Sequence, residues 1–142
     1  MPPKNENKEA ELQQLYAQLQ YMEEQSKQLE HESHAIEQKR AEFMKIIDQL
    51  ESFKKSKKDA KVFSNIGAGI FAQGKIADIS EFLVNVGDGN FVKKSVDEVK
   101  TNLKKQVEEF DTVQKQITQN LTLLGIQSQI IQGQMQKDLG VE

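Results

Sequence analysis

The first third of the chain places apolar residues at the seven-residue spacing of a coiled coil. With Leu12 at heptad position a, every position d is apolar, whereas position a is apolar at both ends of the stretch and polar in its middle. Position d holds Leu15, Met22, Leu29, Ile36, Phe43 and Leu50, and position a holds Leu12, Leu19, Ser26, Ser33, Arg40 and Ile47. The other residues are mostly Glu, Gln and Lys, which favour helix, so the pattern predicts a long helix over residues 9–58.

The last third of the chain repeats this pattern and predicts a second helix over residues 95–139. Apolar residues recur there every seven positions, at Val96, Leu103, Phe110, Ile117, Leu124 and Ile131. We assign the other seam position to Val92, Val99, Gln106, Val113, Asn120, Gln127 and Gln134. Further apolar residues widen the stripe at Val107, Leu121, Leu123, Ile130 and Met135.

Neither predicted helix can bury its apolar stripe alone, so each needs a partner helix. The two helices are similar in length and flank a glycine-rich middle region, which predicts an antiparallel pair joined through that region. In this pairing Leu50 lies near Val96, and Leu12 lies near Ile131 at the opposite end. Residues 1–8, which contain both prolines of the chain, are predicted to be a disordered N-terminus.

Residues 59–94 combine β-branched and aromatic runs with short glycine-rich breaks, which is typical of β-hairpins. The breaks Ile66-Gly67-Ala68-Gly69-Ile70 and Val86-Gly87-Asp88-Gly89-Asn90 resemble each other, so the pattern predicts two hairpins of one type. Ser95 precedes Glu98 by three residues, as in a capping box that opens a helix. Two short hairpins with exposed edges cannot hold a core alone, so we expect them to form an oligomerisation sheet with other chains. The candidate oligomerisation residues are Val62, Ile66, Ile70, Ile76, Phe82, Val84, Val86 and Phe91.

Composition excludes several classes of protein. The net charge is −3 and Arg40 is the single arginine, which disfavours a nucleic-acid binder. The chain has no cysteine, and therefore no disulfide, thiolate metal site or Cys nucleophile. No apolar run is long enough to cross a membrane, and the polar N-terminus does not read as a signal peptide, so we expect a cytoplasmic protein.

The sequence offers few candidates for catalysis or for cofactor binding. His31 and His34 lie three residues apart, but no third ligand accompanies them, so we expect no metal site. The run Lys54-Lys55-Ser56-Lys57-Lys58 could bind an acidic surface, although a basic helix end that complements the helix dipole is favoured. Glu23-Glu24 and Glu108-Glu109 read as solvated helix faces. Gly67-Ala68-Gly69 matches neither a phosphate-binding loop nor a dinucleotide-binding motif, so we expect no cofactor and no enzymatic activity.

The order helix, two glycine-turn hairpins, helix, with no proline between Lys4 and the C-terminus, resembles the alpha-class subunit of archaeal prefoldin. The matching residues are Ile66-Gly67-Ala68-Gly69, Gly74, Val84-Asn85-Val86-Gly87-Asp88-Gly89, Phe91-Val92-Lys93-Lys94-Ser95 and Asp97-Glu98. Two hairpins favour the alpha over the beta class, and the first turn resembles that of archaeal members. One departure is Asn65, where family members often carry a proline.

The resemblance implies a fold, an activity and partners. The fold class would be α+β, a long antiparallel two-helix coiled coil whose two β-hairpins form an oligomeric β-barrel platform. The activity would be that of an ATP-independent chaperone, in a hexamer of two alpha and four beta-class subunits. The coiled-coil tips would hold non-native client proteins and deliver them to a group II chaperonin, with no nucleic acid or membrane as partner.

The helix tips are the candidate substrate-binding surface, because a coiled-coil end cannot bury all of its apolar residues. The candidates are Leu12, Leu15, Tyr16, Leu19, Met22, Ile126, Ile130, Ile131, Met135 and Leu139. The alternative is that these residues only pack against each other, and Tyr16 and Ile130, which lie off the seam, favour client contact. The polar seam residues Ser26, Ser33, Arg40, Gln106, Asn120 and Gln127 could let the helices splay, but we favour a role in setting the register.

A second hypothesis for the whole chain is a coiled-coil scaffold or tether that dimerises through its helices and has no chaperone activity. The middle region separates the two hypotheses, because a tether needs no four-stranded sheet. The sequence itself names no client protein and no partner subunit.

Overall fold

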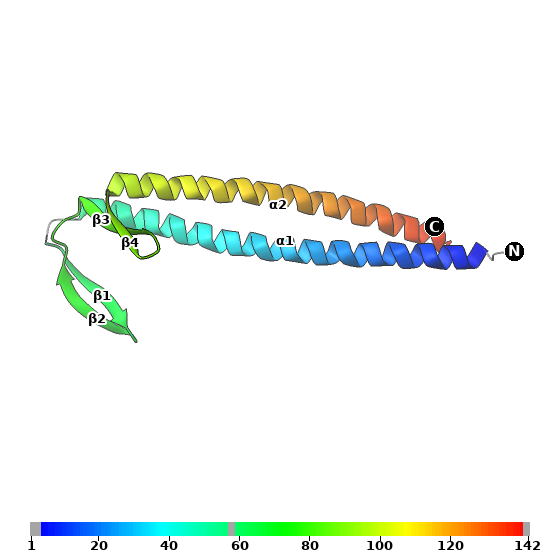
Figure 1. Ribbon diagram of the computed structural model, residues 1–142, viewed down its shortest axis with the longest axis horizontal. Helices are drawn as coiled ribbons and strands as arrows, with labels where there is room; N and C mark the ends of the chain where they lie inside the picture. The colour runs from blue at the N-terminus through cyan, green and yellow to red at the C-terminus, as the bar shows by residue number, and fades with distance from the viewer. Residues whose placement is uncertain (1–3, 57–58, 141–142) are drawn as a thin grey trace. The chain divides into compact units, whose positions relative to one another are not determined.

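The computed structural model describes residues 4–56 and 59–140. Helix α1 (Lys4–Lys55) is followed by strands β1 (Lys61–Gly67), β2 (Ile70–Lys75), β3 (Glu81–Gly87) and β4 (Asn90–Ser95), and by helix α2 (Val96–Asp138) (Figure 1). Two long helices with two β-hairpins between them confirm the predicted elements and their order, whereas the oligomeric β-barrel platform stays a prediction. The chain divides into two compact units, a helical unit from residues 1–38 and 110–142 and a hairpin unit from residues 39–109.

In the helical unit, α1 and α2 pair in opposite directions. The Ser33 hydroxyl donates to Gln114 Oε1 at 2.8 Å, and Gln114 Nε2 donates back to the Ser33 carbonyl at 2.8 Å. Farther along the pair, the Ser128 hydroxyl lies 3.7 Å from the sulfur of Met22. As the α1 number falls from 33 to 22, the α2 number rises from 114 to 128, which confirms the antiparallel pairing predicted from the apolar stripes.

Within the hairpin unit, the segments of α1 and α2 also pair in opposite directions. Lys54 Nζ lies 3.0 Å from Asp97 Oδ1, and Lys100 forms an ion pair with Glu51. The hydrophobic residues that are less than a tenth exposed lie on both helices of this unit, at Ile47, Leu50, Val96 and Val107. Burying one such side chain stabilises the fold by about 1.5–3 kcal/mol. The seam between the helices is therefore the core of this part of the chain.

The seam of α2 runs through different residues from those we predicted. The residues assigned to the second seam position are exposed at Gln106, Val113, Asn120, Gln127 and Gln134. The residue after each of them faces α1 instead, so the seam contains Val107, Gln114, Leu121, Ser128 and Met135. Our assignment was wrong by one residue. We had let the stripe advance by three residues and then by four, from 103 to 106 to 110, whereas it advances by four and then by three, from 103 to 107 to 110. The observed seam buries more apolar surface than the predicted one, because it contains Val107, Leu121 and Met135.

The polar residues predicted in the seam of α1 are partly buried, as expected for Ser26, Ser33 and Arg40. Those predicted in the seam of α2 are exposed, for the reason just given. Ser33 forms its two hydrogen bonds across the seam with Gln114, which is not a residue we had assigned to the seam.

The helix boundaries differ from the prediction at the N-terminus. We expected residues 1–8 to be disordered and the helix to begin at residue 9, but α1 begins at Lys4. No glycine or proline follows Pro3 in this stretch, so nothing interrupts the helix after the two prolines. Residues 1–3, with both prolines, lie outside the described residues, as do Lys57 and Lys58.

At the other helix start, the predicted capping residue is confirmed. Ser95 directly precedes α2, and its hydroxyl accepts a hydrogen bond of 3.2 Å from the Glu98 N–H. This bond satisfies one of the free N–H groups of the first helical turn. Asp97 and Glu98 also place negative charge at the positive end of the helix dipole.

The two hairpins are separate two-stranded antiparallel sheets, β1–β2 and β3–β4. They match at an offset of twenty residues, since Asn65 pairs with Phe71 and Asn85 pairs with Phe91. In each hairpin the register shifts at the residue that follows this asparagine, which is Ile66 in β1 and Val86 in β3. The repeat that the sequence showed in the two turns therefore extends to the register of the strands.

The Ser33–Gln114 bridge generates a prediction about stability. Gln114→Ala removes two hydrogen bonds across the seam, so we expect the free energy of unfolding to fall by about 1–2 kcal/mol. Urea unfolding followed by circular dichroism at fixed protein concentration measures the loss. Gln119→Ala, at an exposed position of the same helix, is the control and should change little.

A double variant separates a lost bridge from a lost side chain. Ser33→Ala with Gln114→Leu replaces both polar partners by apolar groups, which is often neutral or stabilising. We expect this variant to be at least as stable as the wild type. Equal unfolding curves for Gln114→Ala and the wild type would show that the bridge contributes nothing.

Candidate functional site

The hairpins expose large apolar side chains on both of their faces. Side chains alternate between the faces of a strand, and cross-strand pairing joins the two strands on each face. Phe63 and Phe71 share one face of the first hairpin, and Leu83 and Phe91 share the equivalent face of the second. These four side chains are between 57% and 69% exposed. A single chain therefore leaves large apolar side chains uncovered on both hairpins, and exposed apolar patches usually mark interaction sites.

The conformation of the turns depends on glycine and asparagine. In the first turn, Gly67, Ala68 and Gly69 all have positive φ, at 120°, 51° and 74°. The Asn65 side-chain oxygen accepts a hydrogen bond of 2.9 Å from the Gly67 N–H, and Asn85 makes the same bond to Gly87 at 3.0 Å. A side-chain bond of this kind holds a turn locally. Asn65 therefore has a defined role in the first turn, as Asn85 has in the second.

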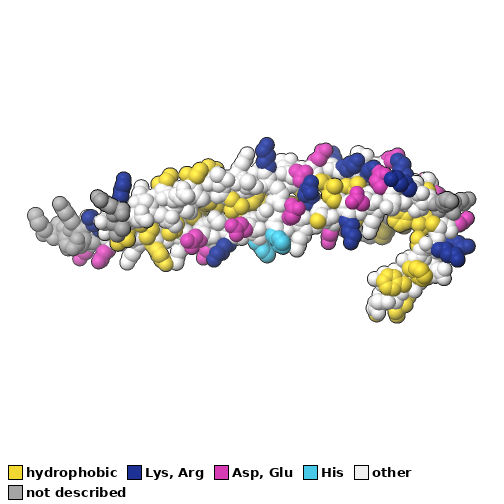
Figure 2. All heavy atoms as spheres, turned by 180° about the vertical axis from the view of Figure 1, so that it is seen from behind, with side chains coloured by type: hydrophobic (Ala, Val, Ile, Leu, Met, Phe, Trp, Pro, Cys, Tyr) yellow, Lys and Arg dark blue, Asp and Glu magenta, His cyan; other side chains and the backbone are white. Residues whose placement is uncertain are grey.

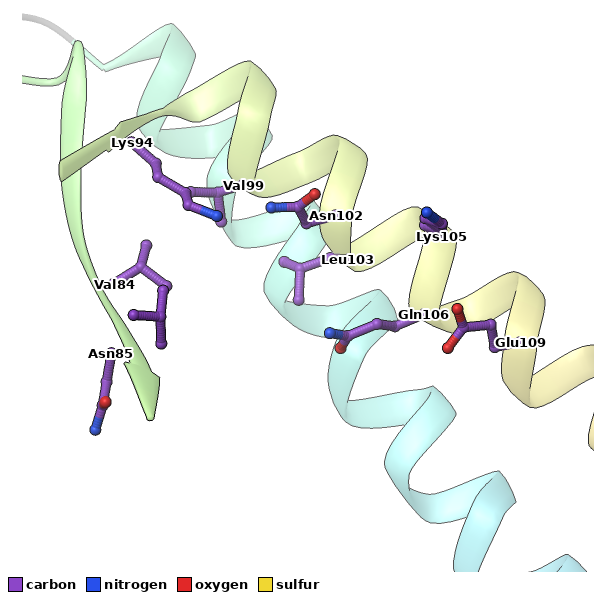
Figure 3. A pocket seen from close by; sticks show the side chains of 10 residues that line it. Val84, Asn85, Lys94, Val99, Asn102, Leu103, Lys105, Gln106 and Glu109 are labelled. Atoms are coloured by element: carbon purple, nitrogen blue, oxygen red, sulfur yellow. The ribbon is translucent and has the colours of Figure 1, made fainter. Parts of the chain in front are cut away.

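The second hairpin forms a groove with α2, with a volume of about 460 Å³ (Figure 3). Val84 from β3 and Val99 and Leu103 from α2 contribute apolar side chains to it, as Figure 3 shows. Polar groups of Lys94 and Glu109 also line the groove. The groove is therefore lined by apolar and by charged side chains together.

The end of α1 positions the second hairpin. The rings of Phe53 and Phe82 meet edge to face, with centroids 5.9 Å apart and planes at 72°. Such a pair is worth about 0.5–1.5 kcal/mol beyond the area it buries. This contact fixes the base of β3 against the last turns of α1.

The predicted oligomerisation residues fall into two groups. Those near the bases of the hairpins and on the groove side are half-buried within the chain, namely Val62, Ile76, Phe82 and Val84. Those near the turns are more than half exposed, namely Ile66, Ile70, Val86 and Phe91. The prediction omitted Phe63, Phe71 and Leu83, which are equally exposed. Treating both faces of each strand as apolar would have found them.

The predicted tip residues also fall into two groups, all within the helical unit. Leu12, Leu15, Leu19, Met22 and Met135 are half-buried, and Ile131 is only 7% exposed. Tyr16, Ile126, Ile130 and Leu139 are more than half exposed. Packing between the two helices explains why the residues of the first group are apolar. The second group has no such explanation within the chain, and it includes Tyr16 and Ile130, the residues predicted to lie off the seam.

The remaining sequence candidates have local roles or none. Lys54 pairs with Asp97, and Lys54 and Lys55 lie in the last turn of α1, where positive charge complements the helix dipole. His34 lies 3.3 Å from the side-chain nitrogen of Gln38. Within residues 4–56 and 59–140, no three His, Cys, Asp or Glu side chains come together in a way that could hold a metal ion. In the same part of the chain, neither helix has a stretch long and apolar enough to span a membrane.

Comparison with known proteins gives a consistent result. A family model described as "Prefoldin subunit" matches residues 22–139. The chain is 30% identical over 129 residues to prefoldin subunit alpha of Methanococcus aeolicus, which covers 91% of this chain and 85% of that protein. It is 27% identical over 127 residues to prefoldin subunit alpha of Archaeoglobus fulgidus, with 89% and 93% covered. A structure of filamentous PFD from Methanocaldococcus jannaschii matches with a TM-score of 0.73 at 15% identity, over 81% of this chain and 95% of that one, which shows a shared fold.

The exposed hairpins generate a prediction about self-association. We expect the isolated chain to associate through residues 60–94, because its strand edges and apolar faces are uncovered. Val84→Lys with Val86→Lys should abolish the assembly and leave the helices largely formed. Native mass spectrometry and far-ultraviolet circular dichroism measure these two effects.

A control adds the same charge elsewhere. Gln129→Lys with Gln132→Lys places two lysines at exposed positions of α2 and should leave the assembly unchanged. An unaltered oligomer in the Val84/Val86 variant would show that the chain assembles through another surface.

Proposed function

We propose, from the premise that this chain belongs to the prefoldin family, that it holds non-native proteins within an oligomer and passes them to a group II chaperonin. As a family member it is a prefoldin-type chaperone subunit, similar to the alpha subunits of archaea. Client holding and delivery are the proposed steps. They rest on the exposed surfaces of the molecule.

The observation that carries client holding is the exposed apolar surface of the helical unit. Tyr16, Ile126, Ile130 and Leu139 are between 51% and 61% exposed, although a paired helix normally presents polar residues to solvent. Each contact of such a side chain with a client is weak. Several contacts made at once from several subunits add through effective concentration, so an oligomer holds a client that one chain would release.

The hairpins support the oligomeric part of the proposal. Apolar side chains on both faces, with unpaired edges, suit a closed β-barrel in which strands of several chains cover each other. The proposed partners are beta-class prefoldin subunits, in a hexamer of two alpha and four beta subunits. The groove lined by Val84 and Leu103 is a place where a neighbouring chain would pack.

The rival is a coiled-coil tether without chaperone activity, and one feature disfavours it. A tether buries its helices and needs no further surface, whereas this chain presents two equivalent hairpins with apolar faces. The mass of the complex formed on mixing with a candidate beta-class subunit separates the two. A hexamer supports the chaperone, and a dimer of this chain alone supports the tether.

The proposed holding of clients requires no nucleotide. The sequence contains no glycine-rich phosphate-binding motif of the form that ends in Gly-Lys-Ser or Gly-Lys-Thr. We therefore expect the assembled complex to suppress aggregation of a denaturant-unfolded client equally with and without ATP. Light scattering after dilution of the client measures this. A purified complex that protects only in the presence of ATP would contradict the proposal.

Truncation tests the position of the client surface. A chain of residues 24–124 lacks Tyr16, Ile126 and Ile130 but keeps the hairpins and the inner seam. We expect it to assemble normally and to lose most of its protection of clients. Assembly is checked by native mass spectrometry, and protection by the same scattering measurement. Full protection by the truncated complex would move client binding to the hairpins or the inner seam.

A further inference from the structure

The base of the first hairpin places two lysines directly opposite each other. Lys61 begins β1, Lys75 ends β2, and the register pairs the two residues across the strands. We call them the lysine pair. Like charges at directly opposite positions of two antiparallel strands destabilise the pairing. Both side chains are exposed, and neither forms an ion pair with any residue in the described part of the chain.

The second hairpin shows that this fold does not require the lysine pair. At the offset of twenty residues, Lys61 corresponds to Glu81 and Lys75 corresponds to Ser95, and these two residues are paired in the same way. Glu81 and Ser95 bring no like charges together, yet their hairpin has the same register and the same turn conformation. The role of the lysine pair therefore lies outside the geometry of the hairpin.

The charges around the lysine pair leave it positive. Lys55, in the last turn of α1, is exposed and adds to the positive charge at this end of the helix. Asp59 and Asp78 flank the hairpin in the sequence, and neither forms an ion pair with the lysine pair. The Asp78 carboxylate accepts hydrogen bonds from the Ser80 N–H at 2.9 Å and from its hydroxyl at 2.7 Å. Figure 2 shows dark blue side chains gathered where the first hairpin begins.

A hollow of about 430 Å³ adjoins the lysine pair. Lys61 lines this hollow, and so does Ile76, which directly follows Lys75. Phe53 from the end of α1 and Val62 from β1 add apolar side chains. Pockets that bind small ligands usually have volumes of about 300–1,000 Å³. The base of the hairpin therefore combines two unpaired cations with a partly apolar hollow large enough for a side chain.

From these observations we infer that the base of the first hairpin is a docking site for a short acidic segment of another protein, with an apolar residue beside its carboxylates. Directly opposite residues have Cβ atoms about 4.5–5.5 Å apart, so both ammonium groups of the lysine pair can reach one carboxylate. The apolar residue of the segment enters the hollow beside Lys61. A bound carboxylate relieves the repulsion that the lysine pair has in the isolated chain.

Two features favour a protein segment over a nucleic acid as the occupant. The chain has a net charge of −3, which disfavours the approach of a long polyanion. The site offers lysines, whose ammonium groups are point charges, whereas the planar fork of arginine is the group that matches a phosphate with two hydrogen bonds. The site lies in the hairpin unit and uses none of the exposed residues proposed to hold clients, so it does not depend on client holding.

The test uses the full chain and a fluorescein-labelled peptide with the sequence Glu-Glu-Leu-Phe-Glu-Glu. We expect it to bind, and its affinity to fall at least about threefold between low and physiological salt, because exposed charges are screened. Replacing its leucine and phenylalanine by serine removes the apolar contact and should weaken binding by about tenfold, or about 1.4 kcal/mol. Replacing its glutamates by glutamine should abolish measurable binding. Fluorescence anisotropy measures all three peptides.

A double variant removes the charge of the lysine pair. Lys61→Gln with Lys75→Gln should lower the affinity for the acidic peptide by about tenfold at low salt. The control, Lys104→Gln with Lys105→Gln, removes the same charge from exposed positions of α2 and should bind as the wild type does. Urea unfolding provides a second readout. The lysine-pair variant should be at least as stable as the wild type, because it loses a repulsion between like charges.

Several results would overturn the inference. Equal affinity of the lysine-pair variant and the wild type for the acidic peptide would place binding elsewhere. A lysine-pair variant that is less stable than the wild type would show that the two lysines stabilise the hairpin itself. A short single-stranded DNA that binds through the lysine pair more tightly than the peptide would make the site one for nucleic acid.

The assembled state gives the last comparison. The complex with a candidate beta-class subunit should bind the acidic peptide as the isolated chain does, and lose this binding with Lys61→Gln and Lys75→Gln. Binding by the isolated chain that disappears in the complex would show that a neighbouring subunit covers the site, which overturns the inference. None of these results bears on whether the helical unit holds clients.

Discussion

The apolar seam between α1 and α2 is the interaction on which the rest of the molecule depends. Long helices of Glu, Gln and Lys gain most of their stability in a protein from packing one apolar face, not from propensity alone. Among the described residues, the hydrophobic side chains that are less than a tenth exposed all belong to this seam. They are Ile47, Leu50, Val96, Val107, Ile117 and Ile131. Within each compact unit, the antiparallel pairing places residues that are far apart in the sequence side by side, such as Ser33 and Gln114 in the helical unit and Lys54 and Asp97 in the hairpin unit.

The hairpins are ordered within themselves but incomplete as a fold. Each has a locally determined turn, with positive φ at Gly67 and Gly87 and an asparagine bond to the same residue. Each also leaves two strand edges unpaired and phenylalanine exposed, as at Phe71 and Phe91. A sheet of two strands is marginally stable in water. Assembly with other chains would therefore complete the fold as well as create the chaperone, which links stability to the proposed function.

The sequence predicted most of the fold because its signals are local and repeated. The heptads of α1, the two glycine turns and the Ser95 cap all appear where expected. The seam of α2 was misplaced by one residue. The heptads of α2 carry apolar residues on several faces, so the pattern permits a seam through Gln106 as well as one through its neighbour Val107. The Ser33–Gln114 bridge follows from that register and could not be found without it. Exposure of Leu123 and of Phe63 depends on tertiary packing, which periodicity alone does not give.

Hydrogen–deuterium exchange of the backbone amides tests the central claim most directly, namely that the hairpins are interface elements completed by other chains. The measurement compares the isolated chain at the lowest workable concentration with the assembled complex. The account predicts that amides of β1–β4 gain strong protection on assembly, whereas those of the seam around Leu50 and Val107 are already protected in the isolated chain. Hairpin amides that exchange equally fast in both states would contradict the account, since the strand edges would then remain unpaired in the complex.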